Sequence, residues 1–355
     1  MAAIADLFPE CRNGPIRLRF DRFLERVLYA HEHGYYSRRD LQFGRLGDFY
    51  TSPHVHFFFA EILSEQFLQV WEWMGSPGRF VLLEMGPGDA TLAFQLLDSI
   101  LRRFRRFSRS VRYIGLEVSA TLAERQRRKL ERFDRAEIIC RGPSFSPIEP
   151  FQGCIFSNEF FDALPFRRFR KAGDAWLEWI VEISREGIRA EWEPTGWQGV
   201  SAASVPSTSI LEWREAFESF YDFASAVLKG GMMLHLDYGD GRQALNPEGT
   251  MRTFQRHRMG DDPFVSLGEQ DITASVDFSH LLDLGRKHRF QNRLMSQREY
   301  LIERGILEKT ALRFDGRNMP EPDAIREKQA LKDLILPGGI SDYFKVLIQE
   351  RLADG

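Results

Sequence analysis

The fold class is decided by one stretch of the sequence, Arg79-Phe80-Val81-Leu82-Leu83-Glu84-Met85-Gly86-Pro87-Gly88-Asp89-Ala90-Thr91-Leu92. It begins with an apolar run typical of a buried strand, passes through a Gly-Pro-Gly turn and continues with helical spacing. Such a turn can bring a ligand against bare backbone at a helix N-terminus. The stretch alone indicates either a structural turn or a cofactor loop, so the surrounding pattern has to decide.

The residues that follow alternate between short apolar runs and charged helical segments. Candidate strands are 111–118, 137–140, 153–157, 231–237, 289–294 and 343–349, and candidate helices are 91–107, 120–133 and 209–229. This alternation indicates a mostly parallel sheet with helices on both faces. The predicted fold class is therefore α/β, doubly wound and Rossmann-like.

The pattern also predicts three sections of chain. Residues 1–77, with amphipathic spacing at 17–33 and 55–74, predict an N-terminal helical cap and a loop. Residues 78–240 predict the core, with a hairpin insert at 174–193 where apolar and polar residues alternate around Glu186-Gly187. Residues 241–355 predict a cap segment and terminal strands that complete the sheet.

Composition limits the function classes. The 355 residues are 43% hydrophobic and 28% charged, which suits a protein with a sizeable core. A net charge of −3 gives no overall field for nucleic acid or an anionic membrane. Cys11, Cys140 and Cys154 are too few and too scattered for a disulfide framework. No apolar run is long enough to span a bilayer, so we expect a cytoplasmic protein, or a mitochondrial matrix protein if the source is eukaryotic.

Basic clusters and histidine pairs are two weaker features of the sequence, and neither leads us to expect a nucleic acid partner or a metal ion. Basic clusters at 102–106, 125–129 and 167–171 interleave with Phe, and we expect solvated helix faces there rather than a nucleic-acid surface. The pairs His31/His33 and His54/His56 have no third candidate ligand at a spacing typical of metal sites, so no metal site is predicted. The sequence gives no indication of the oligomeric state.

The residues around the glycine turn favour S-adenosylmethionine as the cofactor. A dinucleotide fingerprint needs a third glycine three residues after Gly88, where this chain has Thr91, so a nicotinamide oxidoreductase is the weaker alternative. Glu84 would repel a pyrophosphate but suits a cofactor with an ammonium and a sulfonium. Glu117 ends the next strand and could accept both hydroxyls of a ribose, unless it is only a solvated strand end.

A second polar segment follows the fourth strand, where ligands bind in open α/β sheets. It reads Ser157-Asn158-Glu159-Phe160-Phe161-Asp162-Ala163-Leu164-Pro165. An amide, two carboxylates and two aromatic rings beside the cofactor mouth suit an acceptor site. The alternative is a helix N-cap with Asp162 in its first turn.

Several motifs occur in one order along most of the chain: Gly34-Tyr35-Tyr36, Gly47-Asp48-Phe49-x-Thr51-Ser52-Pro53, Glu84-x-Gly86-Pro87-Gly88, Glu117-Val118-Ser119, Asn158 to Pro165, Asp237-Tyr238-Gly239, Gly249-Thr250-x-Arg252 with His257, and Asp271-Ile272-Thr273 with Val276-Asp277-Phe278. This order resembles the MidA-like methyltransferases, a family that includes the mitochondrial complex I assembly methyltransferase. The resemblance implies a class I methyltransferase fold with a seven-stranded sheet. For that relative, it implies methylation of an arginine on a partner protein.

The residues and the resemblance together predict the site. The expected cofactor-binding residues are Glu84, Gly86, Pro87, Gly88, Glu117, Asn158, Asp48 and Thr51. The expected catalytic residues are Glu159, Asp162 and His54, and the expected acceptor contacts are Tyr36, Phe160, Phe161, His257 and Asp277. We expect the loop from Tyr36 to Pro53 to close over the acceptor.

The chain departs from the family pattern at four positions. Asp89 and Ala90 stand where the family has Arg and Gly, and a positive φ at Ala90 would cost about 1 kcal/mol. His54 stands for a glutamate and Ser275 for a histidine. These changes keep two alternatives to arginine methylation open. One is O- or N-methylation of a small molecule, with His54 assisting, and the other is a non-catalytic assembly factor or scaffold.

Overall fold

The computed structural model describes residues 4–38, 57–140, 148–201, 205, 209–256, 258–314, 332, 334–336 and 340–351. The chain divides into two compact units, each made of three segments. The first contains residues 1–49, 161–219 and 240–281, and the second contains residues 50–160, 220–239 and 282–355. Each unit gathers segments from all three predicted sections, and the boundary predicted at 240/241 lies one residue from the change of unit at 239/240.

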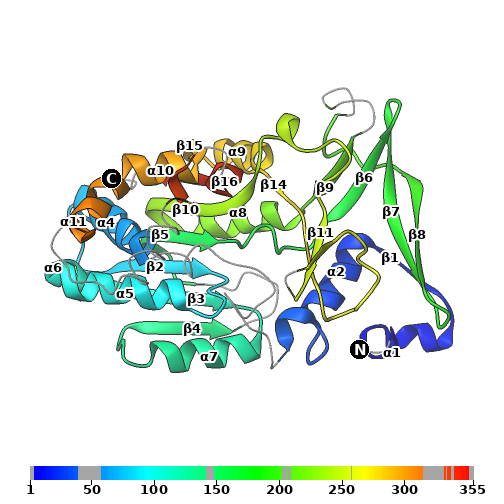
Figure 1. Ribbon diagram of the computed structural model, residues 1–355, viewed down its shortest axis with the longest axis horizontal. Coiled ribbons are helices and arrows are strands. Elements are labelled where there is room, and N and C mark those ends of the chain that lie inside the picture. The colour runs from blue at the N-terminus through cyan, green and yellow to red at the C-terminus, as the bar shows by residue number, and fades with distance from the viewer. Residues whose placement is uncertain are drawn as a thin grey trace. The chain divides into compact units, whose positions relative to one another are not determined.

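The second unit is built on a mostly parallel sheet. Seven of its described strands lie in the order β15 (Gln291–Ser296), β16 (Phe344–Arg351), β10 (Leu228–Asp240), β5 (Phe151–Asn158), β2 (Phe80–Met85), β3 (Val111–Glu117) and β4 (Ala136–Cys140) (Figure 1). Neighbours from β10 to β4 are parallel, whereas β16 is antiparallel to both of its neighbours. The strand order reverses between β2 and β5, and ligands bind at the carboxyl ends of strands beside such a reversal.

Helices cover both faces of this sheet. Phe156 of β5 and Leu234 of β10 belong to the same hydrophobic cluster as residues of α4 (Phe57–Trp73), α5 (Thr91–Arg103), α7 (Ala120–Leu130) and α10 (Gln297–Glu303). Side chains alternate along a strand, so His235 points to the opposite face, where its ring lies 5.2 Å from that of Phe220 in α8 (Ala216–Val227). The predicted doubly wound α/β fold is confirmed.

The other described α-helices are short: α1 (Ile4–Leu7), α2 (Phe20–Tyr29), α6 (Arg105–Ser110), α9 (Phe278–Lys287), α11 (Ile306–Phe314) and α13 (Ile340–Tyr343). Among all the helices that the structure describes, none has the length and apolar character needed to cross a membrane.

The first unit contains an antiparallel sheet. Its strands are β1 (Ile16–Arg19), β6 (Arg167–Ala172), β7 (Ala175–Ile183), β8 (Ile188–Thr195) and β9 (Ile210–Trp213), in the order β1-β7-β6-β9 with β8 paired to β7. β7 and β8 form a hairpin whose turn contains Gly187, where the sequence alternates between apolar and polar residues. A smaller sheet holds β12 (Arg258–Gly260), β11 (Arg252–Gln255) and β13 (Asp271–Thr273), and β14 (Val276–Asp277) precedes α9.

Three local predictions are wrong. The helix expected over 17–33 begins only at Phe20, because residues 16–19 alternate with period two and pair with β7 as β1. The helix expected over 209–229 is preceded by β9, which pairs with β6. The basic cluster at 167–171 is not a solvated helix face, since it forms β6, and Arg167 and Arg168 are buried there.

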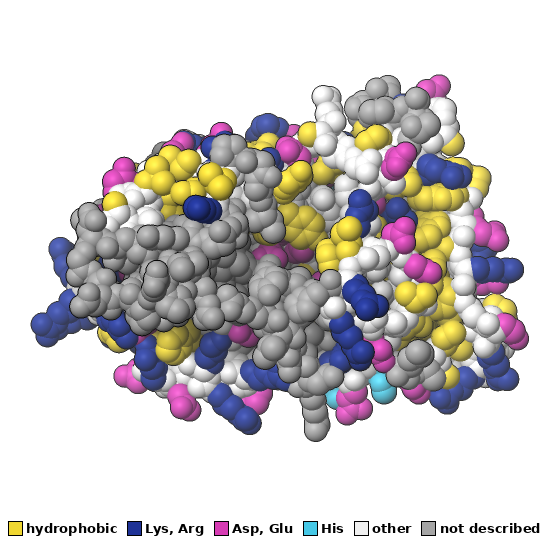
Figure 2. Space-filling view, viewed as in Figure 1, with side chains coloured by type: hydrophobic (Ala, Val, Ile, Leu, Met, Phe, Trp, Pro, Cys, Tyr) yellow, Lys and Arg dark blue, Asp and Glu magenta, His cyan; other side chains and the backbone are white. Residues whose placement is uncertain are grey.

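Charged side chains of both signs are interspersed on the face of the molecule drawn in Figure 2. This distribution agrees with the near balance of 48 basic and 51 acidic residues in the whole sequence.

Candidate functional site

The glycine loop between β2 and α5 is held in a left-handed conformation. Gly86 and Gly88 have φ angles of 62° and 57°. The backbone N–H of Gly86 donates to the carbonyl of Leu116, 2.9 Å away, which ties the loop to β3. A Cβ atom on Gly86 would lie 3.0 Å from Cδ2 of Phe160. The loop therefore presents bare backbone beside that ring.

Ala90, at the end of the loop, also has a left-handed φ of 58° and is fully buried. The neighbouring Asp89 accepts a hydrogen bond from the backbone N–H of Thr91, the first residue of α5, at 2.9 Å, a local turn contact just before the N-cap position Ala90. Lys129 of α7 reaches the same carboxylate at 3.1 Å. Of the two departures from the family pattern, Ala90 occupies the N-cap position of α5, and Asp89 links the start of this helix to α7.

Glu84 is the last residue but one of β2 and lies two positions before Gly86. It is only 2% exposed. The hydroxyl of Tyr113 donates to its carboxylate at 2.6 Å. The pKa of Glu84 is raised to about 8, mainly by burial; the Tyr113 hydrogen bond lowers this pKa, and the charge of Asp89 adds a smaller increase. Its role toward a cofactor ammonium stays a prediction.

Glu117, at the end of β3, is 7% exposed and is not a solvated strand end. Its Oε1 accepts from the backbone N–H groups of Val118 and Ser119, both at 2.9 Å. Its Oε2 accepts from Nε2 of Gln126 at 2.8 Å. A carboxylate offers about four acceptor positions, so this arrangement leaves roughly one for a ribose hydroxyl rather than the two that we expected from the sequence.

The acceptor segment begins in the second unit, at the carboxyl end of β5. Glu159 has a left-handed φ of 52°, and its N–H donates to the carbonyl of Leu236 at 2.8 Å. The amide of Asn158 donates to its carboxylate at 3.1 Å, and the N–H of Phe160 donates to Asp237 at 3.1 Å. A non-glycine residue with a left-handed φ persists only where the surrounding structure enforces that conformation. Such residues occur frequently at functional sites.

The segment continues in the first unit with Asp162, which is 7% exposed. The hydroxyl of Thr273 donates to its carboxylate at 3.2 Å, and the buried Arg214 donates to its backbone carbonyl at 3.0 Å. Tyr36 donates to the carboxylate of Asp271 at 2.8 Å. Burial, followed by the charge of Asp271, raises the pKa of Tyr36 well above its ordinary value. Asp162 and Tyr36 therefore lie in one polar cluster.

Several residues of the hydrogen-bond networks around Glu117 and Asp162 were not among the site residues predicted from the sequence. Asp271 and Thr273 stand in a motif that carried the resemblance, so a signal for them existed. Gln126 and Arg214 gave no signal, because each acts on residues distant in sequence.

Two predicted acceptor contacts are engaged in packing. Phe161 is fully buried, and its ring lies 5.2 Å from that of Phe217. Asp277 is 3% exposed, pairs with Arg242 at 2.6 Å and accepts from the N–H of His280 in the first turn of α9. A role toward an acceptor stays a prediction for both.

Four predicted site residues lie outside the part of the chain that the structure describes: Asp48, Thr51, His54 and His257. Within the described ranges, no group of three or more His, Cys, Asp or Glu side chains could hold a metal ion.

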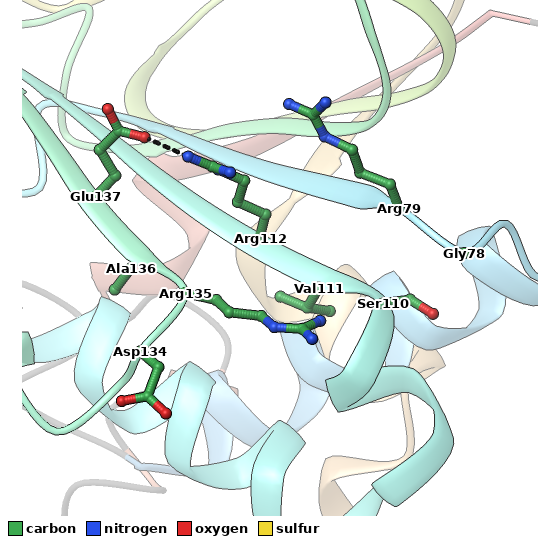
Figure 3. Close-up of a pocket in the computed structure, with 9 residues that line it drawn as sticks. All are labelled: Gly78, Arg79, Ser110, Val111, Arg112, Asp134, Arg135, Ala136 and Glu137. Carbon is green, nitrogen blue, oxygen red and sulfur yellow. Dashed lines mark hydrogen bonds and ion pairs between the residues drawn. The ribbon is translucent and has the colours of Figure 1, made fainter.

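A separate cavity of about 290 Å³ lies at the amino ends of β2, β3 and β4, the edge of the sheet opposite the glycine loop (Figure 3). Arg112 and Glu137 form an ion pair of 2.9 Å across it, and Arg135 donates to the backbone carbonyl of Arg109. This cavity is not part of the candidate site.

The strand order, the antiparallel β16 and the glycine loop between β2 and α5 define a class I S-adenosylmethionine-dependent methyltransferase. Residues 62–295 match a family described as putative S-adenosyl-L-methionine-dependent methyltransferases. The chain belongs to this family, and its resemblance to the MidA-like methyltransferases is confirmed.

Curated relatives carry a more specific name. The chain is 30% identical over 297 residues to the Drosophila melanogaster "Protein arginine methyltransferase NDUFAF7 homolog, mitochondrial", a match that covers 75% of this chain and 65% of that relative. It is 28% identical to the human "Protein arginine methyltransferase NDUFAF7, mitochondrial", covering 96% of this chain and 82% of the relative.

A solved structure is also similar. It is a likely methyltransferase from Burkholderia thailandensis bound to S-adenosylhomocysteine, with 27% identity and a TM-score of 0.84, and the match covers 99% of this chain and 92% of that chain. S-adenosylmethionine is therefore the cofactor of this chain, and the chain is a methyltransferase. The bare backbone at Gly86 and the remaining acceptor position on Glu117 fit this cofactor.

Proposed function

We propose that this chain transfers the methyl group to an arginine nitrogen of a partner protein. The names of the curated relatives support the arginine acceptor. The observation that carries the proposal is the position of Glu159, which is held by Leu236 and Asn158 and is followed by Phe160, the ring beside Gly86. Glu159 thus directly precedes the residue whose ring lies beside the cofactor loop, and this supports an acceptor role for its carboxylate.

The charge of the acceptor explains why a carboxylate is needed there. A guanidinium stays protonated at every physiological pH. It must approach a positively charged sulfonium, and two such charges 4 Å apart repel by about 4 kcal/mol at an effective dielectric constant of 20. Glu159 offsets this repulsion and orients one nitrogen toward the methyl group, while the catalytic role expected for Asp162 of the first unit stays a prediction. Asp162 belongs to the polar cluster that also contains Tyr36.

The remaining residues act on binding and geometry. Gly86 and Gly88 have no side chains, so the cofactor can approach their backbone closely. Glu117 accepts a hydrogen bond from a ribose hydroxyl of the cofactor, and Asn158 orients the Glu159 carboxylate. When bound, S-adenosylmethionine supplies a methyl group: the bond from carbon to sulfur breaks and leaves its electron pair on sulfur, while a nitrogen lone pair forms the new bond to carbon. Glu159 accepts the proton that the nitrogen loses. Correct positioning supplies most of the rate in such a transfer.

The test uses methyl-labelled cofactor and a proteome from cells that lack this protein, with the labelled product identified by mass spectrometry. We expect methylated arginine in protein. Glu159→Gln keeps the shape of the side chain and removes its charge, so we expect turnover to fall by roughly 100-fold while S-adenosylhomocysteine affinity changes less than about twofold.

Glu137→Gln is the matched control, because it makes the same change at the opposite edge of the sheet and should leave turnover unchanged. A full-rate Glu159→Gln enzyme would refute the role of Glu159. Label in a small molecule, or on oxygen, would replace the arginine acceptor by the small-molecule alternative. Cofactor binding without any transfer would identify a scaffold.

A further inference from the structure

Gln126 of α7 connects two parts of the cofactor site. Its Nε2 donates to Oε2 of Glu117 and to the backbone carbonyl of Gly88, each at 2.8 Å. The side chain is fully buried. It therefore joins the carboxylate at the end of β3 to the glycine loop after β2.

The chemistry of the amide makes this connection specific. A side-chain amide has two N–H donors, and both partners here are acceptors, so both donors are used. Its Oε1 is also buried, and no residue in the described part of the chain donates to it. An unpaired buried oxygen is unfavourable. The fold thus keeps the Gln126 donors on Glu117 and Gly88 although the other end of the amide gains nothing.

We propose that Gln126 is a positioning residue for the cofactor, which holds the Glu117 carboxylate and the Gly88 backbone at the spacing that binding requires. The inference rests on the proposed role of Glu117. Gln126 also holds one of the two carboxylate oxygens, so it directs the remaining acceptor position of Glu117 toward the ligand.

The hydrogen bond also favours the ionised form of the carboxylate, against the effect of burial. Burial raises the pKa of Glu117, whereas the donors at Ser119, Gln126 and Val118 lower it. Among the described residues, Tyr113 of β3 and Cys140 of β4 interact electrostatically with it, and Tyr113 donates a hydrogen bond to Glu84. Removing the Gln126 donors should raise the pKa of Glu117 further, so the acid-side loss of cofactor binding should move to higher pH.

The experiment measures S-adenosylhomocysteine binding by calorimetry from pH 5.5 to 9 for wild type and Gln126→Met, which keeps the length of the side chain without its donors. We expect the dissociation constant at pH 8 to rise about tenfold, as for the loss of one hydrogen bond to a charged group. The pH midpoint of binding should also rise. A merely structural role would lower stability without moving that midpoint.

Gln66→Met is the matched control. Gln66 is another buried glutamine in the same unit, and its Nε2 contacts only the Met232 sulfur among the described residues. This variant should bind like wild type. A folded Gln126→Met protein with unchanged affinity and pH midpoint would overturn the inference. Glu117→Gln separates the two claims: if it also binds normally, the role of Glu117 itself fails, and if it alone loses affinity, only the role of Gln126 fails.

Discussion

Ala90 shows how a departure from a family pattern can be tolerated at the scale of one residue. Its left-handed φ of 58° costs roughly 1 kcal/mol relative to glycine. Its methyl group is fully buried in the main hydrophobic cluster, however, and burial of such a group contributes about 0.8 kcal/mol. The two effects nearly cancel, so the position accepts alanine.

This balance predicts the effect of two substitutions. Ala90→Gly should change the free energy of unfolding by less than about 0.5 kcal/mol, since strain and burial are lost together. Ala90→Val places a branched side chain at a positive φ in a filled site and should destabilise by about 2 kcal/mol. Urea denaturation measures both. A glycine variant more stable by well over 1 kcal/mol would show that strain dominates.

Glu84 gives the protein a predictable pH dependence. Its pKa is about 8 in the folded chain and near 4.5 in the unfolded chain. Between these values the folded state holds a proton that the unfolded state releases, so stability falls as pH rises from about 4.5 to about 8. Each tenfold difference in acidity corresponds to about 1.4 kcal/mol.

Glu84→Gln should remove this part of the pH dependence. Without added cofactor, wild type should lose more stability than the variant between pH 5.5 and pH 8.5, as measured by urea denaturation. Groups other than Glu84 contribute equally to both proteins. Parallel curves for the two proteins would contradict the raised pKa.

At the scale of elements, buried ion pairs join the strands of the antiparallel sheet. Arg167 of β6 forms a bidentate pair with Glu178 of β7, with both distances 2.7 Å, and both side chains are at most 10% exposed. Arg167 also bonds Glu215. Arginine suits this position because its planar guanidinium meets a carboxylate with two parallel hydrogen bonds.

Arg167→Met should therefore destabilise the protein by about 3 kcal/mol, because it leaves the Glu178 carboxylate buried and unpaired. Arg189→Met is the control, since the pair of Arg189 with Glu182 is largely exposed and should contribute less than about 1 kcal/mol. Thermal or urea unfolding compares the two. Equal losses would show that burial does not decide the strength of these pairs.

At the scale of the whole molecule, the two units should respond differently to the cofactor product. The glycine loop and Glu117 belong to the second unit, whereas five of the seven tryptophans, all between residues 176 and 213, belong to the first. S-adenosylhomocysteine at 100 times its dissociation constant stabilises the binding-competent state by about 2.7 kcal/mol.

Calorimetry should therefore show a higher unfolding temperature with S-adenosylhomocysteine, and NADH should have no effect. If the units unfold in separate steps, tryptophan fluorescence should follow mainly the step that the ligand leaves unchanged. A ligand shift that is equal by both methods would instead show that the units unfold together.

The sequence by itself determined the α/β class, the glycine loop and the carboxylates at the strand ends. These features depend on near neighbours: the period of an apolar run, a turn between strand and helix, a charge that ends a strand. For this reason the structure confirms the strand, turn and helix start predicted over residues 79–92 and the strand that ends at Glu117.

Only the tertiary structure decided how many acceptor positions Glu117 keeps, which residues hold Asp162, and that each compact unit draws on three separate segments. It also turned residues 16–19 and 210–213 into strands, because each pairs with a partner distant in the chain. Gln126 reaches Gly88 across 38 positions only because α7 packs beside β3. No local pattern encodes such a contact, since its energy belongs to the packing of elements and not to either segment alone.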